Sequence, residues 1–368
     1  MPTAVARTAP SSAAPHASAT EKSGASIRVN NFDLIRLLAA LQVVASHGSD
    51  FLNAPLWHPM MVVLGFLPGV PIFFVVSGFL ISLSWERAPS ARLYVRNRML
   101  RIYPGLWVCL LVSIAIFLSA GVRPDSLTHF VTWVAAQATV VQFYNPVFLR
   151  SFGIGVLNGS LWTIPVELQF YLLLPFLAVV TQRRPERWIA LTLGAGIVMM
   201  LARIELPAHE SMLQKLLGVS IIPYLFYFLV GILMRHLYER RPNIFVQRGM
   251  FWATVYALWA IIETRYSIIG ANGNLLNVTS IVLIAMLTVS MAFTARGVSS
   301  RVLRGNDISY GLYIYHAPVM NLLIAHQFAG RRAFALFLAT TIAMAILSWR
   351  LVEKPALSLK DYSIRPTQ

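Results

Sequence analysis

Long apolar runs recur along this chain of 368 residues, separated by short segments that carry Arg and Pro. Ten of the runs are long enough to cross the roughly 30 Å hydrocarbon core of a bilayer as helices. They are residues 32–52, 60–85, 102–120, 161–181, 188–206, 218–238, 250–268, 275–295, 308–328 and 333–352. A helix satisfies its own backbone polar groups without water. The pattern therefore predicts an all-α polytopic membrane protein with about ten transmembrane helices.

Residues 127–145 are apolar but interrupted by Thr and Gln, so the pattern alone leaves their placement open. Cytoplasmic loops of membrane proteins carry an excess of Lys and Arg. With ten spans, and with residues at span ends counted in the adjoining loop, 21 Lys and Arg lie inside and 7 outside. An eleventh span at 127–145 gives 14 on each side. The bias favours ten spans with both termini cytoplasmic, and residues 121–160 then form an external loop containing an interfacial or re-entrant helix.

Composition agrees with a membrane protein. Hydrophobic residues make up 57% of the chain and charged residues only 12%, whereas soluble domains carry about 25% charged residues. The net charge of +16 comes from arginines between apolar runs, where they face the cytoplasm and anionic lipid. We therefore expect the lipid bilayer, and not nucleic acid, as the partner of this charge. The single cysteine, Cys109, lies within an apolar run and excludes a disulfide framework.

One membrane domain accounts for nearly the whole sequence. Residues 1–28 are rich in Ala, Ser, Thr and Pro, a composition typical of a disordered tail, here cytoplasmic. No cleavage site of a signal peptide follows the first apolar run. We expect the membrane domain over residues 29–355 and a short cytoplasmic tail over residues 356–368. No internal repeat is visible, and we expect no metal ion.

Arg36 and His47 are the most informative residues of the first apolar run. Eleven residues correspond to about three helical turns, so both side chains project from one face, ~16 Å apart along the axis. An ionisable group at membrane depth costs about 2.5–3.5 kcal/mol. Two such groups on one stripe favour a polar chamber inside the helix bundle. The alternative is a pair of structural polar contacts between helices.

Arginines also gather before the third run. Residues 86–101 carry five of them, and Arg98 and Arg101 are neighbours on one helical face. Guanidinium groups suit bidentate recognition of phosphate. The alternative is the ordinary positive charge of a cytoplasmic loop.

Small and polar residues occupy intermediate depths. Ser77 and Gly78 in the second run, with Pro71 one to two turns before them, allow close helix approach or line a cavity. Glu167 in the fourth run lies at a depth similar to that of His47. It is expected either to orient His47 or to be a neutral carboxyl bonded to backbone.

In the ninth run, Tyr310, Tyr313 and His316 recur every three residues along one face. Such a stripe is more often packing than chemistry. Taken with the other polar residues, however, it completes a ladder of polar groups through the bundle. The ladder suits a phosphate-bearing donor from inside and an acceptor from outside, with the imidazole of His47 removing a proton from a hydroxyl.

At this point the sequence resembles the acyltransferase 3 family of integral membrane acyltransferases, which includes bacterial O-antigen and exopolysaccharide O-acetylases. Six blocks match in order, from about residue 30 to residue 355. They are Asp33-x-x-Arg36 followed by His47; Phe73-Phe74-x-x-Ser77-Gly78-Phe79-Leu80; Arg98-x-x-Arg101-Ile-Tyr-Pro104; Leu161-Trp162 with Glu167-x-x-Phe-Tyr171; Ser309-Tyr310 with Tyr315-His316-x-Pro318; and Glu353-Lys-Pro355. Glu167 stands alone where the family often has a second acidic residue.

The resemblance implies ten membrane helices and transfer of an acyl group, usually acetyl from cytoplasmic acetyl-CoA, to an extracytoplasmic hydroxyl. By position, His47 looks like the catalytic histidine, with Arg36 and Glu167 as its partners. The acyl-CoA site is expected to contain Arg98, Arg101, Ser77, Phe73 and Phe74, and the supporting residues are expected to be Asp33, Tyr310 and His316. Acyl-CoA would be a substrate, and no cofactor would be bound.

We therefore expect a bacterial inner-membrane O-acyltransferase whose acceptor is a glycan or a lipid-linked glycan precursor. One alternative is a proton-coupled transporter, in which His47, Glu167 and Arg36 relay protons. Such transporters usually show an internal repeat, which this sequence lacks. A second alternative is a membrane scaffold without catalysis, which needs no aligned Arg36 and His47.

Overall fold

The computed structural model describes residues 29–55, 58–87, 90–181, 184–205, 216–266 and 274–360. These residues form helices and no strand, as the apolar pattern predicts. The α-helices are α2 (Phe32–Phe51), α3 (His58–Phe66), α4 (Gly69–Arg87), α5 (Ala91–Ser119), α6 (Leu127–Ala138), α7 (Thr163–Thr181), α8 (Pro185–Glu205), α10 (Leu225–Arg240), α11 (Gly249–Arg265), α12 (Val278–Ala292), α13 (Val298–Leu303), α14 (Ser309–Ala325), α15 (Gly330–Ser348) and α16 (Lys354–Ser358). Shorter 3-10 turns are η1 (Val147–Leu149), η2 (Gly159–Trp162) and η3 (Pro242–Ile244), and η4 (Trp349–Glu353) is a π-helical turn. The predicted tail 1–28 and residues 361–368 lie outside the described residues.

Each of the ten predicted apolar runs coincides with a helix. They correspond to α2, α3 with α4, α5, α7, α8, α10, α11, α12, α14, and α15 with η4. Four stretches are long and apolar enough to cross a membrane by length and composition, namely Pro59–Arg87, Ala91–Ser119, Gly159–Thr181 and Gly330–Ser358. The protein is therefore a helical membrane protein. The count of ten crossings and the cytoplasmic placement of both termini stay predictions.

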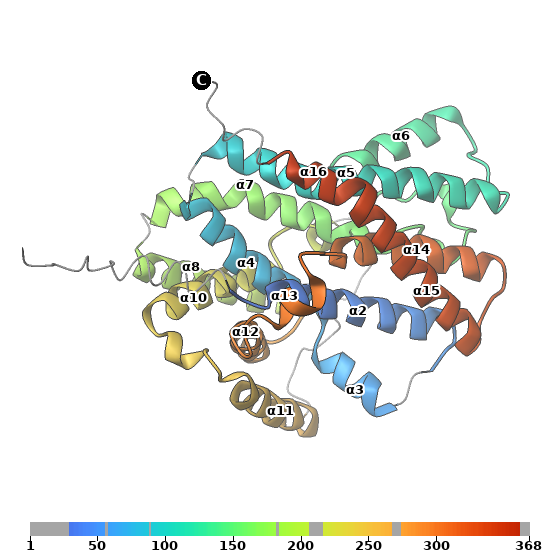
Figure 1. Cartoon of the computed structure of the whole chain (residues 1–368). Helices are drawn as coiled ribbons and strands as arrows, with labels where there is room; N and C mark the ends of the chain where they lie inside the picture. The colour runs from blue at the N-terminus through green and yellow to red at the C-terminus, as the bar shows by residue number, and fades with distance from the viewer. Residues whose placement is uncertain are drawn as a thin grey trace, which may run out of the picture.

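The ambiguous segment 127–145 begins with a helix that lies outside the main bundle. Helix α6 starts at Ser126, whose hydroxyl oxygen accepts a hydrogen bond from the backbone N–H of His129 at 3.1 Å, as an N-cap does. It packs on α5 (Figure 1), where Trp133 meets Phe117 with ring centroids 5.6 Å apart. The helix expected within residues 121–160 is present, and its side of the bilayer stays a prediction.

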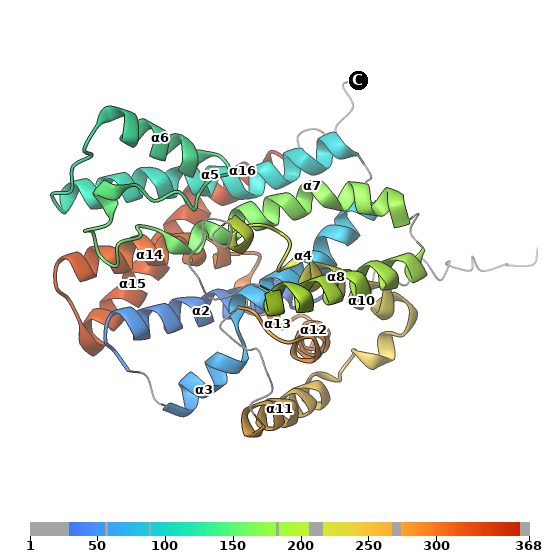
Figure 2. The same cartoon turned by 180° about the vertical axis from the view of Figure 1, so that it is seen from behind.

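The helices lie in two groups on either side of the middle of the molecule. Helices α2, α14 and α15 lie together in one group, α4, α7, α8 and α10 lie in the other, and α5 runs past both (Figures 1 and 2). Helices α2 and α4 contact each other where the groups meet. The segments that carry Arg36, His47 and Glu167 therefore converge at the centre of the bundle.

Helices α4 and α10 pack with their backbones in contact, because each presents a glycine to the other. A Cβ at Gly78 would overlap the carbonyl oxygen of Phe228, and a Cβ at Gly231 would overlap that of Val75. The close approach expected at Gly78 is thus confirmed. Nearby, the fully buried Arg235 of α10 donates two hydrogen bonds of 2.6 Å to the carboxylate of Glu86 in α4.

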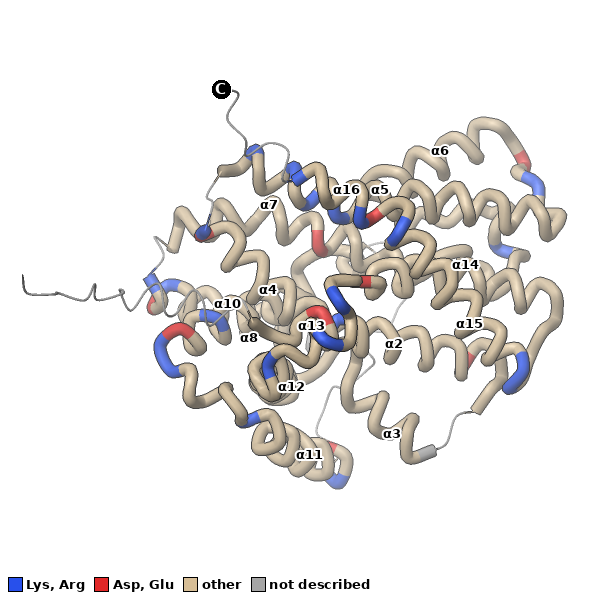
Figure 3. Tube along the Cα trace, viewed as in Figure 1, with Lys and Arg blue, Asp and Glu red and all other residues tan. Residues whose placement is uncertain are grey.

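Charge is distributed as expected for a bundle of apolar helices. The Lys and Arg positions lie mostly near helix ends and in connections, and few lie in mid-helix (Figure 3). The polar side chains that do enter the bundle are therefore exceptions, and several of them line two adjoining cavities.

Candidate active site

The first of these cavities lies between α2, α4, α7 and α14. It has a volume of about 70 Å³ and is called the Glu167 cavity below. Its lining residues are Arg36, Val70, Phe73, Phe74, Ser77, Thr163, Ile164, Glu167, Ser309, Tyr310 and Tyr313. Six of the predicted site residues, Arg36, Phe73, Phe74, Ser77, Glu167 and Tyr310, come from four separate segments of the chain and thus surround one space.

The second cavity contains His47. It has a volume of about 270 Å³ and is called the His47 cavity below. Its lining residues are Gln42, Val43, Ser46, His47, Gly65, Pro68, Val70, Gly159, Ser160, Trp162, Asn274 and Tyr313. Val70 and Tyr313 line both cavities. The stripe on α2 therefore runs from Arg36 in one cavity to His47 in the next, with two side chains forming the wall between them.

Arg36 is held by a carboxylate from the connection before α14. Its Nη1 lies 2.9 Å from Oδ2 of Asp307, and Nη2 of Arg101 lies 2.5 Å from the same oxygen. The other oxygen of Asp307 accepts a hydrogen bond of 2.5 Å from the hydroxyl of Ser309. Two guanidinium groups thus share one carboxylate, which ties α2, α5 and α14 together and leaves an excess positive charge in this trio.

Asp307 remains ionised in this setting. Burial raises the pKa of its carboxyl, but the guanidinium groups of Arg101 and Arg36, with the hydrogen bonds from Ser309, outweigh burial and hold the pKa below its ordinary value. Two further carboxyl groups, Asp33 and Glu353, interact electrostatically with the same arginines. The cluster is therefore a partly buried ion-pair network and not an isolated charge.

His47 meets a second histidine. Its Nδ1 lies 3.0 Å from Nε2 of the fully buried His316 in α14. The hydroxyl of Ser160 lies 3.0 Å from the same Nε2. Nδ1 of His316 lies 2.7 Å from the backbone carbonyl of Tyr313. The supporting residue predicted at position 316 therefore contacts the predicted catalytic histidine directly.

The structure does not place Glu167 beside His47, as the similar depth in the sequence suggested. The carboxylate of Glu167 accepts hydrogen bonds from the hydroxyl of Ser77, at 3.0 Å, and from the hydroxyl of Tyr171. The reason is spacing: Ser160 reaches the histidine pair, and Glu167 lies seven residues further along, about 10 Å away for helical geometry. The group that orients His47 is His316, and Glu167 belongs to the neighbouring cavity.

The two arginines predicted to bind phosphate differ in their surroundings. Arg101 already forms an ion pair with Asp307. The guanidinium of Arg98 lies over the rings of Tyr94 and Tyr171, 6.0 and 5.7 Å from their centroids. No ion pair among the described residues includes Arg98, and its buried Nε has no hydrogen-bond partner there. Arg98 is thus the better-placed cation for an incoming anion.

The remaining predicted residues fall into place around these groups. Tyr310 donates a hydrogen bond of 2.9 Å to the carbonyl of Ile102, and its ring lies 5.9 Å from the guanidinium of Arg101. Phe73 packs edge-on against Tyr313. Phe74 packs in the core against Phe228. These aromatic side chains therefore give the Glu167 cavity its walls.

Sequence reasoning missed two residues of the site. Asp307 lies just before the ninth apolar run, in a connection that the sequence analysis did not consider. The available signal was Arg36 within the first run together with Arg101 directly before the third run, since arginines at the bundle need a carboxylate nearby. Ser160 directly precedes the Leu161-Trp162 block, and nothing in its surroundings marks it out. Among the described residues, no three His, Cys, Asp or Glu side chains are arranged to hold a metal ion.

Comparisons with known proteins bear on this site. Residues 29–353 match the family described as an acyltransferase domain. The chain is 35% identical over 352 residues to nodulation protein 10 of Rhizobium leguminosarum bv. viciae, over 90% of this chain and 94% of that protein. It is 27% identical over 340 residues to an O-acetyl transferase of Shigella phage Sf6, over 88% and 95% of the two chains.

A longer relative matches over the same part of the chain. Identity to the peptidoglycan O-acetyltransferase OatA of Listeria monocytogenes is 26% over 360 residues, which is 89% of this chain and 55% of that protein. No solved structure matches the chain. The similarity therefore covers the segment that contains every residue of the two cavities.

Proposed function

The chain belongs to the acyltransferase domain family, and on this basis we propose that it transfers an acyl group, expected to be acetyl, from cytoplasmic acyl-CoA to an extracytoplasmic hydroxyl. The acceptor is a glycan or a lipid-linked glycan precursor, and the location is the bacterial inner membrane. Relatives named as O-acetyltransferases support the acetyl group and the oxygen acceptor. The family match gives no support to the transporter alternative.

The observation that carries the proposal is the chain of hydrogen bonds from the carbonyl of Tyr313 through His316 to His47. The carbonyl of Tyr313 can only accept, so Nδ1 of His316 carries a hydrogen. Nε2 of neutral His316 then holds a lone pair, which faces Nδ1–H of His47 and the hydroxyl of Ser160. This tautomer gives each of these nitrogen and oxygen atoms a compatible donor or acceptor role.

This arrangement determines the role of Nε2 of His47. Because Nδ1 donates to His316, neutral His47 has its lone pair on Nε2. A lone pair in this position suits a general base. The His47 cavity, with about 270 Å³ beside this ring, gives an acceptor hydroxyl room to reach it. His316 is a positioning residue in this scheme, because it acts through His47.

We propose that acyl transfer proceeds in one step with His47 as general base. Nε2 of His47 takes the proton of the acceptor hydroxyl while the hydroxyl oxygen attacks the thioester carbonyl. The carbon–sulfur bond breaks, and the CoA sulfur leaves with the proton returned by the His47 imidazolium. The new bond is an oxygen ester, and the histidine ends in its starting state.

The donor is proposed to approach from the side of Arg98. Its phosphates pair with that free guanidinium, and only the slender acyl-pantetheine arm enters the Glu167 cavity, because about 70 Å³ is far too small for a nucleotide. The arm passes Ser77 and Glu167 to reach the wall of Val70 and Tyr313. A shift of these two side chains would bring the thioester into the His47 cavity.

The decisive experiment uses purified protein in proteoliposomes with radiolabelled acetyl-CoA and extracted cell-surface glycan. His47→Ala is expected to abolish transfer of label to the glycan while the thermal unfolding midpoint stays close to wild type. His326→Ala is the matched control, since His326 is an exposed histidine just after α14, and it is expected to retain full transfer. Transfer at the wild-type rate in His47→Ala would contradict the proposal.

A further inference from the structure

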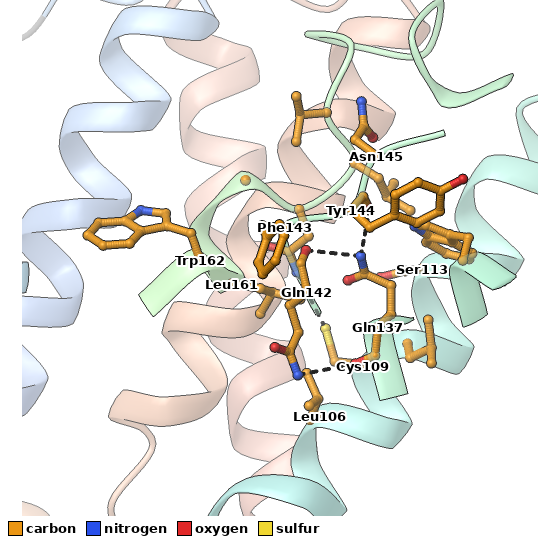
Figure 4. A pocket seen from close by; sticks show the side chains of 16 residues that line it. Leu106, Cys109, Ser113, Gln137, Gln142, Phe143, Tyr144, Asn145, Leu161 and Trp162 are labelled. Carbon is orange, nitrogen blue, oxygen red and sulfur yellow. Dashed lines mark hydrogen bonds between the residues drawn. The ribbon is translucent and has the colours of Figure 1, made fainter. Parts of the chain in front are cut away.

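A third cavity adjoins the His47 cavity. It lies between α5, α6 and the connection that leads to η2, and it has a volume of about 130 Å³ (Figure 4). Its lining residues are Leu106, Cys109, Leu110, Ser113, Trp133, Gln137, Gln142, Phe143, Tyr144, Asn145, Val156, Leu157, Asn158, Gly159, Leu161 and Trp162. We call it the amide cavity. Gly159 and Trp162 line both this cavity and the His47 cavity.

Two buried amide oxygens at this cavity lack a donor. Gln142 is 3% exposed and Asn158 is 9% exposed. Oε1 of Gln142 and Oδ1 of Asn158 have no hydrogen-bond partner among the described residues. A buried acceptor left unsatisfied costs about 1–3 kcal/mol. Two buried acceptors on residues that line the cavity therefore receive no hydrogen from the described residues.

The orientation of both amides is fixed by their nitrogens. Nε2 of Gln142 donates to the carbonyl of Thr139 at 2.6 Å, and Nδ2 of Asn158 donates to the carbonyl of Ile314 at 2.8 Å. Turning either amide over would set two carbonyl oxygens against each other. Gln137 supports the same connection, since its Nε2 donates to the backbone carbonyls of Gln142 and Tyr144. The free groups are thus acceptors by construction.

The rest of the lining selects the kind of ligand. It contains no Asp, Glu, Lys or Arg, and it includes the aromatic residues Trp133, Phe143, Tyr144 and Trp162. A pocket of apolar and aromatic walls with a few fixed polar groups is typical of a small-molecule site. A neutral ligand that donates hydrogens at its edge and presents apolar C–H faces fits both features. A sugar ring has this combination, and the volume is about ten times what one water requires.

We propose that the amide cavity binds a neutral sugar residue of the acceptor. Its hydroxyl groups donate to Oε1 of Gln142 and Oδ1 of Asn158, and the shared wall at Gly159 and Trp162 places another hydroxyl of the glycan next to His47. This inference rests on the proposed acyl transfer, because it assigns the acceptor side of the same reaction. It adds the requirement that the bound sugar residue is uncharged.

The test uses the full chain in proteoliposomes with acetyl-CoA and a panel of methyl glycosides of neutral hexoses and of uronic acids. Ester formation is followed by mass spectrometry, and release of CoA to water is measured without any sugar. Gln142→Met keeps the side-chain length and removes the free oxygen. We expect it to raise the KM for an accepted neutral glycoside roughly tenfold, the loss of one hydrogen bond near the upper end of the usual range, while CoA release without sugar stays unchanged.

Matched variants keep the result interpretable. Phe143→Ala removes an aromatic side chain from the cavity wall and is expected to raise the KM for the same neutral glycoside. It therefore provides a second test of the cavity if Gln142→Met does not fold. Val140→Ala alters an exposed side chain of the same connection that does not line the cavity, and its KM should match wild type. The uronic acid glycosides are expected to be poor acceptors.

The outcomes separate this inference from the proposed function. No ester with any neutral glycoside, a preference for uronic acids, or an unchanged KM in both cavity variants overturns the sugar site. Any of these can occur while CoA release still depends on His47, which leaves the acyltransferase proposal standing. If the wild type released no more CoA than His47→Ala does, the proposed function itself would be contradicted.

Discussion

His47 in α2 and His316 in α14 are 269 residues apart in the chain, and Nδ1 of His47 lies 3.0 Å from Nε2 of His316. In the mechanism that we propose, this contact places the lone pair of neutral His47 on Nε2, the nitrogen that does not face His316.

The first prediction tests this positioning role. His316→Leu removes the acceptor of the His47 Nδ1–H, so we expect kcat to fall about 100-fold, within the range that general-base catalysis contributes, with little change in the KM for acetyl-CoA. His316→Gln retains an oxygen that can accept this hydrogen and should restore part of the rate. Steady-state kinetics across pH 6–9 check the prediction. Equal losses in the Leu and Gln variants would argue that the residue serves packing alone.

The second prediction concerns donor binding at Arg98. Its guanidinium has no carboxylate partner among the described ion pairs, so Arg98→Gln should remove a contact to phosphate without breaking an internal pair. Hydrogen bonds to charged groups contribute about 1.5–3 kcal/mol, and we expect the KM for acetyl-CoA to rise about 10- to 100-fold with kcat nearly unchanged. Arg92→Gln, an exposed residue of the same helix, is the control. A fall in kcat at constant KM would rule out phosphate docking.

The third prediction concerns the pH dependence of stability. The pKa of Asp307 is held below its ordinary value of about 3.8 in the folded protein. Its stabilising contribution is therefore fully present above about pH 4 and declines as the pH falls further, because the unfolded chain then takes up a proton that the folded carboxylate still excludes. Thermal unfolding in detergent from pH 7 to pH 3 measures this loss. Asp33 and Glu353 interact with the same arginines, so single variants of each separate their contributions.

Removal of the Asp307 charge should reproduce the acid effect at neutral pH. Asp307→Asn leaves Arg36 and Arg101 without their shared carboxylate, and we expect the free energy of unfolding to fall by about 3–5 kcal/mol. The variant should also lose part of its acid sensitivity below pH 4. Asp50→Asn, at an exposed position near the end of α2, is expected to behave as wild type. An Asp307→Asn variant as stable as wild type would show that the ion pairs contribute nothing net.

The fourth prediction concerns the glycine contact between α4 and α10. Gly78→Ala forces a Cβ against the carbonyl of Phe228, and overpacking of this kind typically costs about 1–3 kcal/mol. Gly194→Ala in α8 is the control, since a Cβ there meets no atom within 4 Å, and it should be neutral or stabilising. Thermal midpoints of the two variants in the same detergent give the comparison. A stable Gly78→Ala variant would mean that the helices can separate at no cost.

Much of the architecture could be predicted, because it depends on local properties of the sequence. The length of each apolar run locates its helix, and helical geometry alone places Arg36 and His47 on one face. The resemblance likewise placed Ser77, Phe73 and Phe74 together, and the Glu167 cavity contains all three.

The contacts between distant segments could not be predicted in the same way. Similar depth in two helices does not say whether they face each other, and for that reason Glu167 was expected beside His47 while His316 occupies that place. Asp307 lies outside every apolar run, so the hydropathy pattern that located the other residues does not identify it. The amide cavity depends on the path of the connection after α6, which hydropathy does not determine.

The two residues shared by the cavities, Val70 and Tyr313, also bear on how the cavities are kept apart. The hydroxyl of Tyr313 donates to the carbonyl of Ser160 at 2.8 Å and lies 2.9 Å from the hydroxyl of Thr163. These contacts anchor the Tyr313 ring to η2 and to the start of α7, so a movement of this ring that joins the two spaces has to break at least one of them.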